Sequence, residues 1–263
     1  MYDFIIIGAG VVGASIAREL SRYDVDVAVL EAREDVATAT TGANSAIVHA
    51  GYDRAPDTTM ARLNVEGNRL FDEIKRELDI PFKRVGSLVL AFDEEDEHML
   101  NVLLEQGRKS GVEGLEIISR EEVLDREPSI NPDILSALWA PTGGITCPYE
   151  LTVAYMENAI DNGVKIFLNH PVTGISKRDD GTFSITTSDG EFKASYIINC
   201  AGLNGDAIPK MLGVKEFTIT PRRGEYLLYD RKYGNTVNSV IFQTPSKVSK
   251  GVLVTQTVDG NLL

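Results

Sequence analysis

The stretch Tyr2-Asp3-Phe4-Ile5-Ile6-Ile7-Gly8-Ala9-Gly10-Val11-Val12-Gly13 decides the fold of this chain. An apolar run leads into three glycines with the spacing G-x-G-x-x-G, and a second apolar run, Val25 to Leu30, ends at Glu31. The order strand, glycine turn, helix, strand and acidic residue is typical of the dinucleotide-binding βαβ unit. We therefore predict a strand over residues 2–7, followed by a helix from Val11 to Arg22.

The residue types in this unit suit a dinucleotide. Gly8 lets the chain turn sharply off the strand, Gly10 lets the backbone approach a pyrophosphate, and Gly13 lets the helix pack closely on the sheet. The free N–H groups and the dipole at the helix N-terminus attract phosphates. Glu31 can accept hydrogen bonds from both ribose hydroxyls, and its charge would repel a 2′-phosphate, so the sequence disfavours an NADP-type ligand.

Composition and charge exclude several classes of function. The chain has 263 residues with 26 Lys and Arg against 39 Asp and Glu, a net charge of −13, which predicts no nucleic-acid partner. It has no apolar run of about 18 residues, so no transmembrane segment is predicted, while peripheral membrane contact stays open. Cys147 and Cys200 are isolated, which favours a reduced, cytoplasmic protein. The three histidines, His49, His98 and His170, lack metal-ligand spacing, so no metal site is predicted.

The rest of the chain predicts an α/β fold with two interleaved domains. Asp180-Gly181 and Asp189-Gly190 join three apolar runs and predict an antiparallel meander over residues 172–194. A further strand is expected over 196–200. The predicted domains are a nucleotide-binding domain of residues 1–80 and 145–215, and a second sheet-containing domain of residues 81–144 and 216–263.

Two further segments carry predictions that the structure can test. An amphipathic helix is expected from Thr58 or Thr59 to Leu78. Its predicted buried face consists of Leu63, Gly67, Leu70, Phe71, Ile74 and Leu78. Residues 219–229 are expected to form a strand interrupted near Gly224. The chain stops at Leu263, soon after the turn Asp259-Gly260, which predicts that the sequence is the N-terminal part of a longer protein.

The segment Thr40 to Gly51 is the second informative stretch. It gathers small and hydroxyl side chains and carries no Asp, Glu, Lys or Arg. Small side chains let backbone N–H groups reach a large flat ligand, whereas Asn44 and the hydroxyls can bind phosphate or ring edges. The alternative is a polar surface loop, but such loops rarely contain so few charges.

Three elements of the sequence resemble FAD-dependent oxidoreductases of the D-amino-acid oxidase superfamily. They are the glycine turn with Glu31, the segment T-T-G-A-N-S…H-A-G at 40–51, and Asn199-Cys200-Ala201-Gly202-Leu203. Arg223-Gly224-Glu225-Tyr226 is similar to a strand of the branch that contains glycerol-3-phosphate dehydrogenases and L-2-hydroxyglutarate dehydrogenases. The resemblance implies a Rossmann-like FAD-binding domain, with a βαβ unit and a β-meander, interleaved with a mixed-sheet substrate domain.

The resemblance also implies which residues hold the cofactor, FAD. Gly8, Gly10 and Gly13 would cradle the pyrophosphate, whereas Glu31 and Arg33 would hold the adenosine. The other residues implied as cofactor contacts are Thr40, Thr41, Asn44, Ser45, Ile47, Val172, Ala201 and Gly202.

Two residues are candidates for the catalytic machinery. His49 is expected near the flavin ring, where it would take a proton, orient the flavin or only pack. Arg223 would clamp a carboxylate or phosphate by two parallel hydrogen bonds, or be an ordinary strand-end charge.

The activity implied by the resemblance is transfer of a hydride from a small anionic hydroxy substrate to flavin N5, while a base or water takes the hydroxyl proton. Glycerol 3-phosphate is the first expected substrate, L-2-hydroxyglutarate or another 2-hydroxy acid the second, and an amino acid the third. The electron acceptor would be a quinone, oxygen or a redox protein. A nicotinamide-dependent dehydrogenase is a rival that residues 40–51 oppose. An inactive nucleotide-binding fragment is the other rival, and such a chain would bind flavin poorly.

Overall fold

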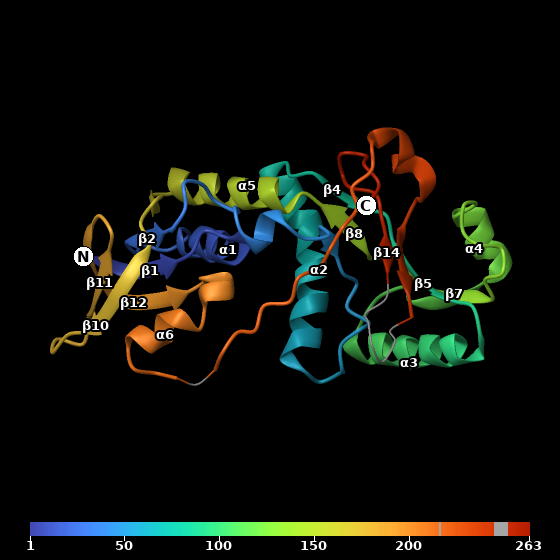
Figure 1. Ribbon diagram of the computed structural model, residues 1–263, viewed down its shortest axis with the longest axis horizontal. Helices are drawn as coiled ribbons and strands as arrows, with labels where there is room; N and C mark the ends of the chain where they lie inside the picture. Colours follow the sequence, from blue (N-terminus) through green and yellow to red (C-terminus); the bar gives the residue numbers. More distant parts are fainter. Residues whose placement is uncertain (216, 245–251) are drawn as a thin grey trace. The chain divides into compact units, whose positions relative to one another are not determined.

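The computed structural model describes residues 1–215, 217–244 and 252–263. The chain divides into two compact units, each built from two separate stretches of sequence (Figure 1). The first unit comprises Met1–Asn44 and Pro148–Gly224, and the second comprises Ser45–Cys147 and Glu225–Leu263. Both units combine helices with sheets, so the predicted α/β fold class is confirmed.

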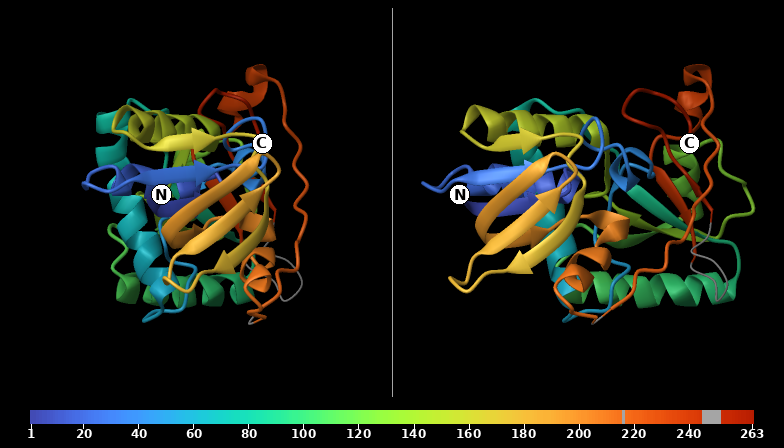
Figure 2. Two further views of the ribbon diagram at one scale, coloured as in Figure 1. Left: turned by 90° about the vertical axis from the view of Figure 1, so that its left-hand side faces the viewer. Right: turned by 60° about the vertical axis from the view of Figure 1, so that its left-hand side comes forward.

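A six-stranded sheet forms the centre of the first unit, in the order β10-β11-β12-β1-β2-β9. The strands are β1 (Tyr2–Ile7), β2 (Val27–Leu30), β9 (Lys165–Phe167), β10 (Val172–Lys177), β11 (Phe183–Thr187) and β12 (Gly190–Asn199). β1 runs parallel to β12 and to β2, and β2 is parallel to β9, whereas β10, β11 and β12 form an antiparallel meander (Figure 2). The predicted meander is confirmed, but the runs expected at 191–194 and 196–200 form one strand.

Helices α1 (Val11–Leu20) and α5 (Pro148–Asp161) lie side by side in the first unit (Figure 1). Small buried residues of α1, among them Ala14 and Ala17, let the backbones come close, and Arg18 Nε donates to Asn158 Oδ1 of α5 at 3.2 Å. The remaining helical segments are η1 (Thr40–Gly42), η2 (Gly202–Asn204) and α6 (Ala207–Met211). Ile208 of α6 completes an apolar cluster with the isoleucines of β1, β10 and β11.

The second unit contains two sheets, one of five strands in the order β14-β13-β5-β7-β6 and one of three strands in the order β3-β8-β4. The strands are β3 (Ile47–Val48), β4 (Phe82–Arg84), β5 (Ser87–Ala91), β6 (Glu116–Ser119), β7 (Ser136–Ala140), β8 (Gly144–Thr146), β13 (Val240–Gln243) and β14 (Leu253–Val254). The helices are α2 (Thr59–Leu78), α3 (Glu94–Ser110), α4 (Arg120–Arg126) and η3 (Arg231–Thr236). α3 packs on β5 and β7, and the leucines of α3 fill the core between the helix and these strands.

The boundaries of the two units differ from the predicted ones. Residues 45–80 were expected in the first unit, but they belong to the second. The physical reason is that β3 pairs with β8 and that Val65 of α2 packs in the same core cluster as the leucines of α3. Residues 216 and 245–251, which the prediction assigned to the substrate domain, lie outside the described residues.

The buried face of α2 agrees only in part with the predicted face, of which Gly67, Phe71, Ile74 and Leu78 are half-buried. Leu63 and Leu70 are 53% and 51% exposed, whereas Ala61, Val65 and Asn68 are buried. The apolar spacing favoured the leucine face, but Ala61 and Val65 are narrow enough for the helix to lie close to the neighbouring chain, and the amide of Asn68 has hydrogen-bond partners inside the unit.

A charged side chain lies in the core of the second unit. Glu127, directly after α4, is 0% exposed. Its carboxylate accepts the backbone N–H of Asn238 at 2.8 and 3.1 Å and that of Ser239 at 2.6 Å. The side-chain amide of Asn238 in turn donates to the carbonyl of Arg126 at 2.7 Å. These bonds tie the end of α4 to the residues that lead into β13.

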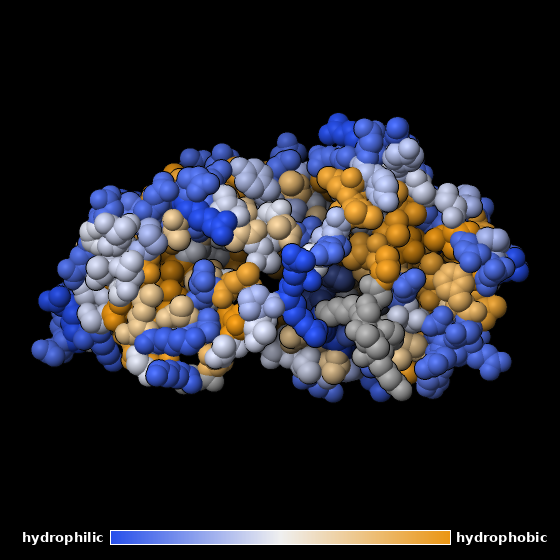
Figure 3. All heavy atoms as spheres, viewed as in Figure 1, coloured by the Kyte–Doolittle hydropathy of each residue, from blue (hydrophilic) through white to orange (hydrophobic). Residues whose placement is uncertain are grey.

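The strand predicted over residues 219–229 is not formed. A strand requires a ladder of hydrogen bonds to a neighbour, and within the described residues the β-pairing of this segment consists of an isolated bridge between Tyr229 and Leu262. Leu227 and Leu228 are 73% and 65% exposed, and apolar side chains are visible on the surface of the second unit (Figure 3). None of the described helices has the length and apolar character needed to cross a membrane.

Candidate cofactor-binding site

The candidate site lies where the parallel strands β1, β2 and β12 end. Ile7, the last residue of β1, pairs with Leu30 on one side and with Asn199 on the other. The chain leaves these strand ends at Gly8, Glu31 and the residues after β12. Ligands of open α/β sheets bind beyond the carboxyl ends of the strands, at the point where the order of the strands in the sheet reverses. The structure thus brings together three of the predicted segments.

The glycines of the turn have no room for side chains. Gly8 has a φ of +103°, and a Cβ there would lie 2.5 Å from the carbonyl oxygen of Cys200. A Cβ on Gly13 would lie 2.0 Å from the carbonyl oxygen of Gly8, and one on Gly10 would lie 3.1 Å from Thr41 Oγ1. Gly8 and Gly13 therefore pack backbone against backbone. Gly10, which has no side chain, leaves the backbone of the turn accessible to a ligand.

The N-terminus of α1 presents donors suited to an anion. Val11 donates its N–H to Thr41 Oγ1 at 3.1 Å, while the N–H groups of Val12 and Gly13 have no acceptor among the described residues. The side-chain amide of Asn44 donates to the carbonyls of Thr40, at 3.1 Å, and Thr41, at 2.8 Å. Asn44 therefore holds the η1 turn that carries the Thr41 hydroxyl.

Glu31 is half-buried and keeps part of its hydrogen-bonding capacity. Its Oε2 accepts the N–H of Ala9 at 2.7 Å, and its Oε1 accepts the N–H of Arg33 at 3.0 Å. A carboxylate has about four acceptor sites, so two remain for ribose hydroxyls. With the glycine turn and the donors of α1, this set of groups suits the pyrophosphate and ribose of a dinucleotide such as FAD.

The end of β12 forms the other side of the turn. Asn199 Oδ1 accepts the N–H of Ala201 at 3.2 Å, and its amide donates to the carbonyl of Gly205 at 2.7 Å, which shapes the η2 turn. Gly202 opens η2 with a φ of +56°. Partial burial raises the pKa of the Cys200 thiol above its ordinary value.

Two other predicted contacts also lie in the first unit. The exposed Arg33 follows β2 and donates from its guanidinium to the carbonyl of Thr38 at 2.8 Å. Val172 begins β10, where it pairs with Thr187 beside an irregularity in the ladder. Arg223 also belongs to this unit, but it lies in the exposed segment that forms no strand.

Three of the predicted site residues belong to the second unit, namely Ser45, Ile47 and His49. Ile47 pairs with Ile145 in the three-stranded sheet. His49 follows β3 and is exposed, and its ring stacks on Phe242 with centroids 5.8 Å apart and planes 24° from parallel. The structure therefore divides the predicted site residues between two compact units.

Replacing Glu31 is expected to weaken FAD binding. Glu31→Ala should make the free energy of FAD binding less favourable by about 1.5–3 kcal/mol, because both the ribose and the N–H of Ala9 lose a charged acceptor. The constant is measured by titration of flavin fluorescence. Glu34→Ala, an exposed carboxylate of the same loop, is the control and should leave the constant unchanged. Equal flavin affinity in Glu31→Ala and wild type would contradict this role.

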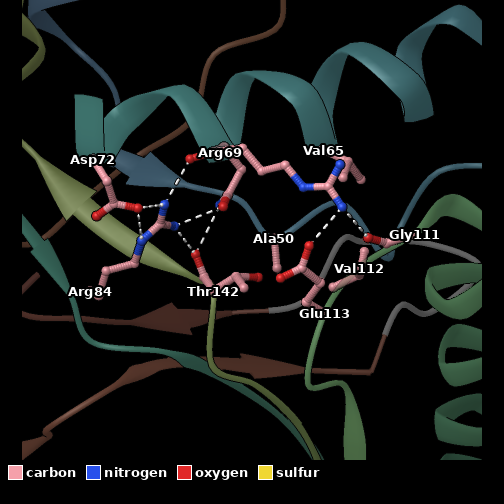
Figure 4. Close-up of a pocket in the computed structure, with 10 residues that line it drawn as sticks. Ala50, Val65, Arg69, Asp72, Arg84, Gly111, Val112, Glu113 and Thr142 are labelled. Carbon is pink, nitrogen blue, oxygen red and sulfur yellow. Dashed lines mark hydrogen bonds and ion pairs between the residues drawn. The ribbon is translucent and has the colours of Figure 1, made fainter. Parts of the chain in front are cut away.

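Sequence reasoning did not single out Asn68 or Arg84, which line a pocket of about 170 Å³ in the second unit (Figure 4). Asn68 donates to the carbonyl of His49 at 2.9 Å, and Arg84 donates to Asn68 Oδ1 at 2.7 Å. The only signal for Asn68 in the sequence was a polar residue on the buried face of a helix. Its hydrogen-bond partners could not be inferred, because they lie far away along the chain.

Comparison with known proteins agrees with this geometry. The family description FAD dependent oxidoreductase (DAO) matches residues 3–263. The chain is 54% identical over 263 residues to a glycerol 3-phosphate dehydrogenase of Caloramator mitchellensis, covering 100% of this chain and 55% of that protein. It is 32% identical over 267 residues to an L-2-hydroxyglutarate dehydrogenase of Escherichia coli, covering 100% of this chain and 63% of that protein.

A solved structure has the same fold. Dithionite-reduced L-α-glycerophosphate oxidase from Mycoplasma pneumoniae with FAD bound matches with a TM-score of 0.93 at 32% identity, over 99% of this chain and 70% of that one. This chain thus spans little more than half of the Caloramator relative and about two thirds of the oxidase. The resemblance inferred from the glycine turn and the two later segments is confirmed, and the chain belongs to the DAO family of FAD-dependent oxidoreductases.

Proposed function

We propose that this chain binds FAD mainly through residues of its first unit and contributes to oxidation of glycerol 3-phosphate. The observation that supports FAD binding is the glycine turn, in which a Cβ on Gly8 or Gly13 would overlap backbone atoms. The N–H groups at the N-terminus of α1 that lack an acceptor among the described residues support it as well. Gly10 and the donors of α1 would face the pyrophosphate, and Glu31 would bind the ribose. The other predicted cofactor contacts are proposed with them, namely Arg33, Thr40, Thr41, Asn44, Ser45, Ile47, Val172, Ala201 and Gly202.

FAD, when bound, supplies the acceptor for the hydride that leaves the hydroxyl-bearing carbon of the substrate. The protein supplies orientation and proton transfer. We assign His49 as the base that takes the hydroxyl proton, so that the substrate leaves as a ketone. The exposed ring of His49 is accessible to a substrate, and its stacking on Phe242 limits its rotation.

The substrate proposal rests on relatives rather than on the fold alone. A relative 54% identical is a glycerol 3-phosphate dehydrogenase, and one 32% identical is a glycerol 3-phosphate oxidase of Mycoplasma genitalium. L-2-hydroxyglutarate is the second candidate, because dehydrogenases for it are similar at 32–33% identity. All these substrates are small anions with a secondary hydroxyl. The electrons then pass to a quinone, oxygen or a redox protein, and the proposed compartment is the cytoplasm.

An anaerobic bleaching experiment tests the proposed function. The FAD-loaded protein is mixed with glycerol 3-phosphate, L-2-hydroxyglutarate or an amino acid, and the visible absorption of oxidised flavin is followed. Glycerol 3-phosphate should bleach the flavin fastest. If L-2-hydroxyglutarate bleaches the flavin fastest, it replaces glycerol 3-phosphate as the proposed substrate. A protein that binds FAD but is bleached by none of these compounds would refute the proposed class of substrate.

Arg223 is proposed as the cation that binds the substrate anion. Arg223→Lys keeps the charge but loses the two parallel donors of the guanidinium. KM should rise about tenfold, which equals about 1.4 kcal/mol, whereas flavin content should stay unchanged. Steady-state kinetics with glycerol 3-phosphate measure this effect. Arg222→Lys, at the neighbouring exposed position, is the control, and an equal rise of KM in both variants would rule out a specific clamp.

A further inference from the structure

We propose that Asn68 is a positioning residue that fixes the backbone of His49, and that Arg84 locks Asn68 in the orientation this task requires. The inference deepens the proposed function, because it rests on the role of His49 as the base. It concerns contacts inside the second unit only.

Asn68 joins three segments of the second unit through one buried amide. The side chain comes from α2 and is 5% exposed. Its Nδ2 donates to the carbonyl of His49 and to the carbonyl of Thr142, both at 2.9 Å, and its Oδ1 accepts from Arg84 Nη1 at 2.7 Å. Two carbonyl acceptors on one side and a cationic donor on the other allow only one orientation of the amide.

Arg84 gives this arrangement its rigidity (Figure 4). Its Nε and Nη2 donate to Asp72 Oδ2 at 3.1 and 2.6 Å, and Nη2 also donates to the carbonyl of Asn68 at 2.8 Å. Nη1 donates to Asn68 Oδ1 and to the carbonyl of Thr142. All five N–H groups of the guanidinium are therefore used, and both ends of Asn68, backbone and side chain, are held by one planar group.

The segment around His49 is built to present an exposed ring from a fixed backbone. Val48 and Ala50 are 6% and 3% exposed, whereas His49 between them is exposed. Gly51 has a φ of +106°, and a Cβ there would lie 2.8 Å from Val65 Cγ2, so the chain lies directly on α2. β3 has only two residues, and the bond from Asn68 therefore holds the carbonyl at the point where the short strand ends.

Positioning makes a different prediction from simple stabilisation. If Asn68 acts through His49, replacing Asn68 slows flavin reduction by the substrate. The same replacement then has no effect on flavin reduction in a protein that lacks His49. If Asn68 only stabilises the unit, its replacement acts equally in both backgrounds. Misplacement of a reacting group by about 1 Å can cost about 100-fold in rate, so the effect is large enough to measure.

The decisive experiment is a double-mutant cycle on the FAD-loaded protein. Asn68→Asp keeps the shape and the acceptor for Arg84 but donates nothing to the carbonyl of His49. We expect flavin reduction by glycerol 3-phosphate, followed anaerobically by stopped flow, to slow about tenfold at unchanged flavin content. In the His49→Gln background the same change should alter the rate less than about twofold. Equal slowing in both backgrounds would overturn the inference.

Two further variants keep the proposal testable if Asn68→Asp does not fold. Arg84→Lys leaves Asn68 in place but removes the planar group that orients it, and it should slow flavin reduction in the same His49-dependent manner. Arg69→Lys is the matched control, because Arg69 lines the same pocket but bonds Gly111 and Glu113 rather than Asn68, and it should leave the rate within about twofold of wild type. A rate in Arg84→Lys equal to that of Arg69→Lys would contradict the proposal.

A second readout needs no substrate and separates this inference from the proposed function. The chain has three histidines, so the ring signal of His49 in a proton–carbon NMR spectrum is identified by its loss in His49→Gln. Asn68→Asp and Arg84→Lys should shift that signal, and Arg69→Lys should not. An unmoved signal in Asn68→Asp would refute the positioning role, whereas absence of bleaching by glycerol 3-phosphate, together with a shifted signal, would refute the proposed substrate alone.

Discussion

Gly13→Ala is expected to abolish FAD loading under conditions in which the wild-type protein binds it. The added methyl would lie 2.0 Å from the carbonyl oxygen of Gly8, and this oxygen belongs to backbone that is itself packed against Cys200. The helix must therefore move away from the turn, and the N–H groups of its first residues move with it. Overpacking of this kind costs about 3 kcal/mol, and the same loss in FAD binding equals a rise of more than about 100-fold in the dissociation constant.

Flavin fluorescence titration measures the affinity, and thermal unfolding measures the stability. Gly67→Ala is the matched control, because it is also a helical glycine but a Cβ there meets nothing within 4 Å. It should leave FAD binding unchanged and stabilise α2 by about 1 kcal/mol, since alanine favours helix. Normal FAD affinity in Gly13→Ala would show that the turn does not determine cofactor binding.

Glu127→Ala is expected to destabilise the second unit by about 3–5 kcal/mol. Three hydrogen bonds from the N–H groups of Asn238 and Ser239 end on this buried carboxylate, and each bond to a charged acceptor contributes about 1.5–3 kcal/mol in isolation, with losses that do not add fully. Removal leaves the N–H groups of Asn238 and the buried Ser239 without this acceptor and leaves a cavity where the side chain was.

Chemical denaturation monitored through Trp139, the single tryptophan of the chain, measures this loss. Arg126 lies over the Trp139 ring, 4.7 Å from its centroid, so the probe reports from the end of α4. Glu121→Ala, an exposed carboxylate in the first turn of α4, is the control and should cost less than about 1 kcal/mol. A similar small cost for Glu127→Ala would show that its buried charge is not needed for the fold.

Local chemistry explains which parts of the fold were predictable from the sequence. The glycine turn needs residues without side chains at fixed spacing, and the structure shows the overlaps that a Cβ would produce. The capping box of α4 is equally local, because Ser119 and Glu122 lie three positions apart and exchange bonds at 2.9 and 3.3 Å. In both cases the interacting groups are near neighbours in sequence.

Long-range partners explain what was not predictable. Glu127 is buried because it meets the N–H groups of residues more than a hundred positions later, and Asn68 is buried because it meets His49 and Thr142. Apolar periodicity assigns such residues to the surface, and it assigned the exposed Leu63 and Leu70 of α2 to the core. The segment 219–229 has strand-forming side chains, but a strand also needs a neighbour, which a pattern along one segment does not reveal.

The two side-chain acceptors at the glycine turn have a consequence for the order of assembly. Thr41 Oγ1 accepts the N–H of Val11, and Glu31 accepts the N–H of Ala9, so these two peptide groups are satisfied by the protein itself. Buried or half-buried donors without partners are costly, and these two donors avoid that penalty without the cofactor, which leaves the N–H groups of Val12 and Gly13 for its phosphates. We therefore expect this part of the turn to keep its shape in the protein without flavin, so that the flavin binds to a turn that has already folded.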